Sequence, residues 1–135
     1  MSIIEVKNVS RFFGGLAAGL GSMLADLILG YSAYAPATFI IKCLAAVAAA
    51  LLFQLLHKKS SHKILPMLTA AITAGFVVTF GYLLFEGSLL GLGFGPAFMN
   101  IPFNLLQNVF GIIISTLLYP LLRKVPQIVS IMENK

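Results

Sequence analysis

The chain has 135 residues, of which 59% are hydrophobic and only 10% are charged, and its mean hydropathy is +0.99. A soluble domain of this length could not cover so much apolar surface with so few charged side chains, so we expect lipid to surround most of the chain. The net charge of +5 does not indicate a nucleic-acid partner, because the basic residues gather at the ends of the apolar runs and not along one exposed element.

The first half of the chain predicts two spans. The lead MSIIEVKNVS contains Glu5 and Lys7, which interrupt any early apolar core, so we expect no secretory signal peptide. An apolar run then predicts a membrane-spanning helix over Val9–Leu29, because about 20 residues suffice to cross the hydrocarbon. The uncharged turn GYSAYAP at 30–36 separates it from a second span over Pro36–Leu56.

The second half predicts two more spans, over Ile64–Phe85 and Pro102–Leu122, and a short tail at 123–135. The segment EGSLLGLGFGPAFMN at 86–100 is rich in glycine and nearly uncharged, which fits either a loop or a shallow re-entrant segment. With no linker that would divide the chain, the sequence predicts a single all-α integral-membrane domain over residues 1–135.

The distribution of bases predicts the orientation. The linker HKKSSHK at 57–63 is short and basic, as are the flanks of the first and last spans, and loops of this kind face the cytoplasm. We therefore expect both termini and this linker inside, the tail 123–135 in the cytoplasm, and the segments 30–36 and 86–100 on the outer face.

Charged and amide side chains interrupt the spans in their outer halves. Asp26 lies about 6 Å below the outer end of its helix and Lys42 about 9 Å below the start of the next, so adjacent helices bring acid and base to a similar depth. Glu86 follows the third span, and Asn104, Gln107 and Asn108 share one face of the fourth. A charge in mid-bilayer costs about 2.5–3.5 kcal/mol on insertion scales, which favours an outward-facing polar cavity, although a structural Asp26–Lys42 pair also fits.

Small residues recur every four positions in the first span, at Gly14, Ala18 and Ser22, which predicts close packing of helices within the chain. The tyrosines Tyr31, Tyr34 and Tyr82 fit an interfacial belt, and each also offers a ring on which a flat ligand can stack. Cys43 is the single cysteine and is expected to be a small apolar residue. The chain carries no nucleotide-binding loop, metal-ligand spacing or catalytic triad, so we expect no enzyme activity, no metal and no cofactor.

Three segments carry a resemblance to a known family. GLGSMLADLILGYSAYAPATFIIKCL, YLLFEG at 82–87 and IPFNLLQNVFGIIIS at 101–115 resemble, in order and spacing, the substrate-binding (S) components of energy-coupling factor (ECF) vitamin importers, and most closely the riboflavin-type branch. The resemblance implies a six-helix fold with cytoplasmic termini and a vitamin pocket open to the outside, of which this chain supplies helices 3–6. It also implies truncation or a partner that supplies the first two helices, with truncation favoured.

The resemblance further implies a non-enzymatic subunit in a bacterial or archaeal cytoplasmic membrane. Its partners would be a transmembrane coupling subunit, two ATPase subunits and a vitamin-like heterocycle such as riboflavin, pyridoxine or a pyrimidine precursor. Candidate substrate-binding residues are Asp26, Tyr34, Lys42, Glu86, Asn104, Gln107 and Asn108.

Two other functions fit the residues. One is a four-span proton-coupled exchanger, which the position of Asp26 near the outer end of its helix, beside Lys42, fits poorly. The other is a truncated membrane subunit that does not transport.

Overall fold

The computed structural model describes residues 3–58, 64–122 and 124–126. Most of the basic linker 57–63 and most of the tail 123–135 lie outside the described residues. The described part is helical, and four segments of it are long and apolar enough to cross a membrane. The prediction of an all-α membrane protein with four spanning helices is therefore confirmed. The long helices are α1 (Ile3–Ile28), α2 (Ala35–His57), α3 (Ile64–Leu84) and α5 (Ile101–Leu122).

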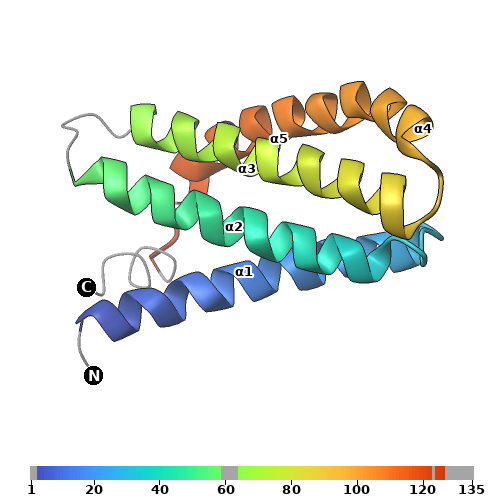
Figure 1. Cartoon of the computed structure of the whole chain (residues 1–135). Helices are drawn as coiled ribbons and strands as arrows, with labels where there is room; N and C mark the ends of the chain where they lie inside the picture. The colour runs from blue at the N-terminus through green and yellow to red at the C-terminus, as the bar shows by residue number, and fades with distance from the viewer. Residues whose placement is uncertain (1–2, 59–63, 123, 127–135) are drawn as a thin grey trace.

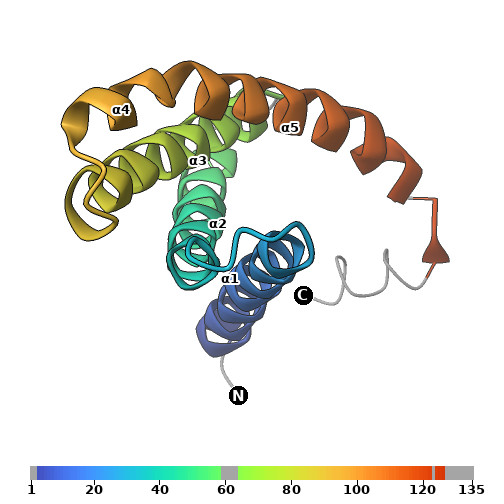
Figure 2. The same ribbon diagram turned by 90° about the vertical axis from the view of Figure 1, so that its right-hand side faces the viewer.

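The four long helices run antiparallel to their neighbours in chain order. α1 packs on α2, α2 on α3, and α3 on α5, and Figure 2 shows that they follow an arc instead of closing into a ring. The α1–α2 turn and the whole α3–α5 connection lie at one end of the molecule (Figure 1). We call this the turn end, residues 29–34 and 85–100. The polar positions of all four helices approach each other there.

Two glycines allow α1 to lie directly against α2. Gly15 and Gly19 are buried, and a Cβ placed on Gly19 would come within 2.7 Å of the carbonyl oxygen of Phe39. Gly14, with which the expected stripe began, has nothing within 4 Å of an added Cβ. The contact stripe therefore lies one residue further along α1 than the sequence pattern indicated. In lipid, where apolar burial drives little association, such close backbone contact is the main source of helix pairing.

The small apolar core lies between α2 and α3 and consists of Ile41, Ala45, Val78 and Tyr82. Gly81 leaves the space that the Ile41 side chain occupies, since a Cβ added to Gly81 would lie 2.9 Å from that side chain. Large apolar side chains elsewhere point outward; Phe76 is 71% exposed and Phe80 is 61% exposed. This inverted arrangement is expected when acyl chains and not water cover the surface.

The segment 86–100, whose sequence fits either a loop or a shallow re-entrant segment, lies in two short helical pieces. α3 continues into a single π-helical turn, η1 (Phe85–Leu89), and the helix α4 (Phe94–Met99) follows. Gly91 and Gly93 take positive φ values of 73° and 82° between them, a region that favours glycine. Gly87 leaves room for the Phe94 ring, which would lie 2.6 Å from an added Cβ. The connection is therefore folded tightly against the end of α3.

Candidate ligand-binding site

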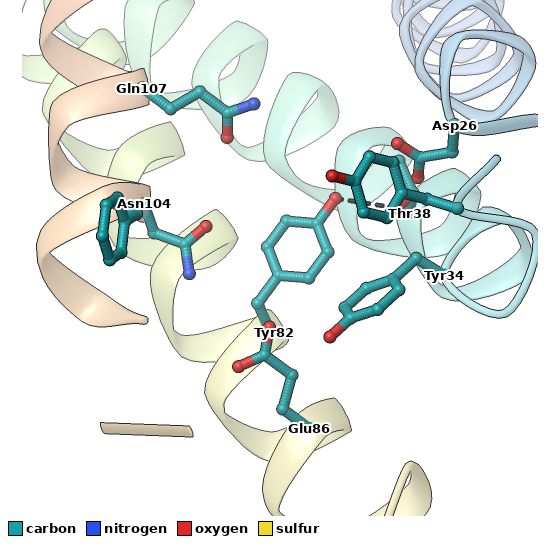
Figure 3. A pocket seen from close by; sticks show the side chains of 9 residues that line it. Asp26, Tyr34, Thr38, Tyr82, Glu86, Asn104 and Gln107 are labelled. Atoms are coloured by element: carbon teal, nitrogen blue, oxygen red, sulfur yellow. Dashed lines mark hydrogen bonds between the residues drawn. The ribbon is translucent and has the colours of Figure 1, made fainter. Parts of the chain in front are cut away.

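A cavity of about 350 Å³ opens at the turn end, and every long helix contributes to it. Figure 3 shows its layout: Asp26 enters from α1, Thr38 from α2, Tyr82 from α3, and the two amides from α5 on the opposite side. Its volume is at the lower end of the range for small-molecule sites. The lining consists of Asp26, Tyr31, Tyr34, Thr38, Tyr82, Glu86, Phe103, Asn104 and Gln107.

Tyr82 forms the middle of the cavity wall. Its hydroxyl shares a 2.8 Å hydrogen bond with the Thr38 hydroxyl, and both side chains are buried, at 9% and 2% exposure. Tyr34 packs beside Tyr82 at a centroid distance of 6.5 Å and makes an edge contact with Phe85 at 5.7 Å. These contacts fix the aromatic rings in place, so the cavity presents preformed flat surfaces.

Glu86 is almost completely buried, at 4% exposure, and η1 directs it into the cavity. The Asn100 amide donates to its carboxylate at 2.9 Å. Partial desolvation raises the pKa of the Tyr34 hydroxyl above its usual 10.0, and the negative charge of Glu86 and a hydrogen bond to it raise it further. The Tyr34 phenol therefore stays protonated at physiological pH and can donate to this carboxylate. Glu86 thus joins α3, the α1–α2 turn and the residue that precedes α5.

Asp26 faces the cavity from the opposite side. Its Oδ2 atom is enclosed and has no hydrogen-bond partner among the residues that the structure describes. Its charge acts on the ammonium group of Lys42, but Lys42 does not line the cavity; it lies one helical turn deeper than Thr38, with its Nζ atom 6.0 Å from the Tyr82 ring centroid. The sequence predicted acid and base at similar depth, and of the two only Asp26 lines the cavity.

The first turns of α5 supply the amides. Asn104 and Gln107 both line the cavity, and Figure 3 shows their side chains extending from α5 toward Tyr82. The backbone N–H of Asn104 bonds to the Asn100 carbonyl at 3.0 Å, so the same residue that binds Glu86 also begins the hydrogen bonding of α5. Each amide offers both donors and acceptors to a ligand.

Asn108 is directed elsewhere. Its Nδ2 atom donates to the Gly75 carbonyl at 3.0 Å and to the Thr79 hydroxyl at 3.2 Å, and it does not line the cavity. An added Cβ on Gly75 would lie 3.1 Å from this amide nitrogen, so the glycine provides the space for the contact. Asn108 therefore serves as an interhelical hydrogen bond between α3 and α5.

Replacement of Asn108 with alanine is expected to destabilise the protein by about 1 kcal/mol, the scale of interhelical hydrogen bonds in membranes. The measurement is reversible unfolding in mixed micelles followed by circular dichroism. Val109→Ala is the matched control, because Val109 neighbours it on α5 and is 52% exposed. Equal stability of the two variants would contradict this structural role.

Thr38 and Phe103 line the cavity without having been predicted from the sequence, and Tyr31 and Tyr82, which fitted either an interfacial belt or stacking on a flat ligand, also line it. Thr38 and Phe103 carry no distinctive signal, since a single threonine or phenylalanine in a span is ordinary. One signal was usable: Thr38 follows Tyr34 by four residues and therefore lies on the same helical face. Tyr82 likewise precedes Glu86 by four residues.

This arrangement can hold a small planar molecule, with rings to stack on it and carboxylates and amides to bind its edge. In the described segments, no three His, Cys, Asp or Glu side chains gather in a way that could hold a metal ion. The lining combines hydrogen-bond donors and acceptors with aromatic rings, so the geometry fits recognition of a ligand.

The comparison with family models matches residues 10–124 to the ECF-type riboflavin transporter S component. That match covers most of the chain, and the chain belongs to this family of membrane-embedded transporter subunits, which is not a class of enzymes. The resemblance found in the sequence is thereby confirmed, and the proton-coupled exchanger is not favoured. Neither the curated proteins nor the solved structures yield a match.

Proposed function

We propose that this protein captures a vitamin or related small heterocycle at the outer side of the membrane and serves as the substrate-binding subunit of an ECF-type importer. The proposed ligand classes are riboflavin, pyridoxine and pyrimidine precursors, with riboflavin the first to test because the matching family is that of riboflavin transporter S components. The proposed binding groups are Asp26, Tyr34, Glu86, Asn104 and Gln107, together with the rings of Tyr31, Tyr82 and Phe103 and the Thr38 hydroxyl.

The observation that carries this proposal is the convergence of polar side chains from four spans on one cavity at the turn end. Polar groups in lipid are costly and rarely gather without a function. Their alternation with tyrosine and phenylalanine rings suits a flat heterocycle whose edge bears hydrogen-bonding atoms.

The proposed orientation follows from charge. Lys58 and Lys124 are exposed at the end of the molecule opposite the cavity, and the positive-inside rule assigns that end to the cytoplasm. The cavity then opens outward, in the cytoplasmic membrane of a bacterium or archaeon. A transmembrane coupling subunit and two ATPase subunits would supply the energy for release, because the described part of this chain has no nucleotide-binding loop.

The test is a titration of the purified full chain in lipid nanodiscs with riboflavin, pyridoxine and a hydroxymethylpyrimidine, read by flavin fluorescence and by calorimetry. We expect saturable binding of one of them. The double variant Asn104→Ala/Gln107→Ala should weaken it about tenfold or more, since each lost hydrogen bond removes about 0.5–1.5 kcal/mol. Val109→Ala/Ile113→Ala is the matched control on α5, because both residues are about half exposed and outside the cavity.

Two results would oppose the proposal. One is an absence of saturable binding for every ligand by a folded protein. The other is equal affinity of the amide double variant and its control, which would place the ligand elsewhere.

A further inference from the structure

The charged groups around the cavity do not balance. Asp26 and Glu86 both line it, and both of their negative charges act on the Tyr82 phenol between them. Lys42 is outside the lining, and its Nζ atom lies over the Tyr82 ring at 6.0 Å from the ring centroid. Two carboxylates in the lining, against one ammonium outside it, leave the lining with an excess of acidic groups.

The hydrogen bonding of the two carboxylates is also incomplete. Glu86 accepts from the Asn100 amide at 2.9 Å, whereas Asp26 Oδ2 is enclosed without a partner in the described segments. A carboxylate has about four lone-pair positions and accepts only. The enclosed oxygen of Asp26 therefore favours a ligand that brings a donor or a positive charge, because an enclosed polar atom without a hydrogen bond is costly.

We infer that, within the ligand class of the proposed function, the cavity selects by charge: it favours a planar heterocycle with a cationic or amino group directed at Asp26 and Glu86, and it disfavours one with a carboxylate or phosphate at that position. The ligand class in this inference rests on the proposed function. The electrostatic argument does not depend on the proposed function. A cleft lined by one sign of charge concentrates ions of the opposite sign and speeds their entry about 10- to 1,000-fold.

A reporter thiol tests the cavity potential without any ligand. In a Cys43→Ala background, which removes the native cysteine, Gln107→Cys places a thiol in the cavity lining. Its rates of reaction with a trimethylammonium-ethyl and a sulfonatoethyl methanethiosulfonate are compared in the full chain in nanodiscs. Leu89→Cys is the matched control, because Leu89 is 82% exposed at the same end and outside the lining.

We expect the ratio of the cation rate to the anion rate to be at least about tenfold higher at position 107 than at position 89. Asp26→Asn or Glu86→Gln should each lower the ratio at position 107 and leave it unchanged at position 89. The two variants are tested separately, so that a folding defect in one leaves the other informative. Equal ratios at both positions, or ratios at position 107 that neither variant changes, would overturn the inference.

A ring-matched series then tests ligand selection. Three pyridines that differ only in an aminomethyl, hydroxymethyl or carboxylate group at ring position 4 compete with labelling of the position-107 thiol. We expect protection in the order cation, neutral, anion, with at least about a tenfold difference between the ends of the series. Equal or reversed protection would overturn selection by charge. If the thiol reacts faster with the cationic reagent but no vitamin binds in the titration above, the negative potential is supported and the proposed function is overturned. Failure of the charge inference and failure of the proposed function are therefore distinguishable.

Discussion

Replacement of Glu86 with alanine is expected to weaken vitamin binding about 10- to 100-fold, because hydrogen bonds to a charged group are worth about 1.5–3 kcal/mol. The side chain is 4% exposed and accepts from Asn100 at 2.9 Å. Its loss leaves the Asn100 amide without this acceptor and releases the connection that precedes α5. The measurement is the dissociation constant by calorimetry, in nanodiscs, with the ligand found in the titration.

In the same experiment, Glu86→Gln separates the effect of side-chain volume on ligand affinity from the effect of side-chain charge. The amide keeps the volume and one acceptor oxygen, so we expect a loss smaller than that of alanine. Ser88→Ala is the matched control, because Ser88 lies two residues further along η1, is exposed, and donates only to the Leu84 carbonyl of its own helix. Binding by Glu86→Ala that equals the control would remove Glu86 from the site.

Replacement of Gly19 with alanine is expected to destabilise the α1–α2 pair by about 1–3 kcal/mol, the usual cost of overpacking. The added Cβ would lie 2.7 Å from the Phe39 carbonyl oxygen. That atom belongs to helix backbone, so the helices themselves must separate. The measurement is reversible unfolding in mixed micelles, and Asp26 provides a second readout because it lies on the displaced helix and its contribution to binding should fall.

Gly21→Ala is the control for Gly19, two residues along the same helix, with nothing within 4 Å of an added Cβ. Alanine favours a helix over glycine by about 1 kcal/mol, so this variant should be neutral or slightly more stable. Destabilisation of both variants to the same extent would mean that the effect does not come from contact with α2.

The sequence was informative about the helices and about the depth of the polar groups. Long apolar runs predict spans directly, because only a helix satisfies its own backbone in lipid. Asp26, Glu86, Asn104 and Gln107 could be assigned to one end because depth depends only on the number of residues from a helix terminus. The structure has all four of them around one cavity.

The direction in which a side chain points depends on the rotation of its helix about the helix axis, and this was harder to predict. Lys42 and Asn108 lie at suitable positions in the chain, yet neither lines the cavity: the Lys42 ammonium lies over the Tyr82 ring and Asn108 donates to the Gly75 carbonyl. The α1 contact stripe was displaced by one residue for the same reason, since Gly14 and Gly15 are both small and only packing decides which one faces α2. Phe103 gave no usable signal, because apolar residues are common in spans.

The position of α5 has a mechanical consequence. None of its described side chains is buried, and it packs mainly on α3, with Asn108 as a hydrogen-bonded attachment between the two. The α1–α2 pair, in contrast, is held by backbone contact at Gly15 and Gly19. The amide-bearing wall is therefore attached to the rest of the bundle by fewer close contacts than the wall that carries Asp26, so we expect a change in the width of the space beside Tyr82 to come from α5 before α1.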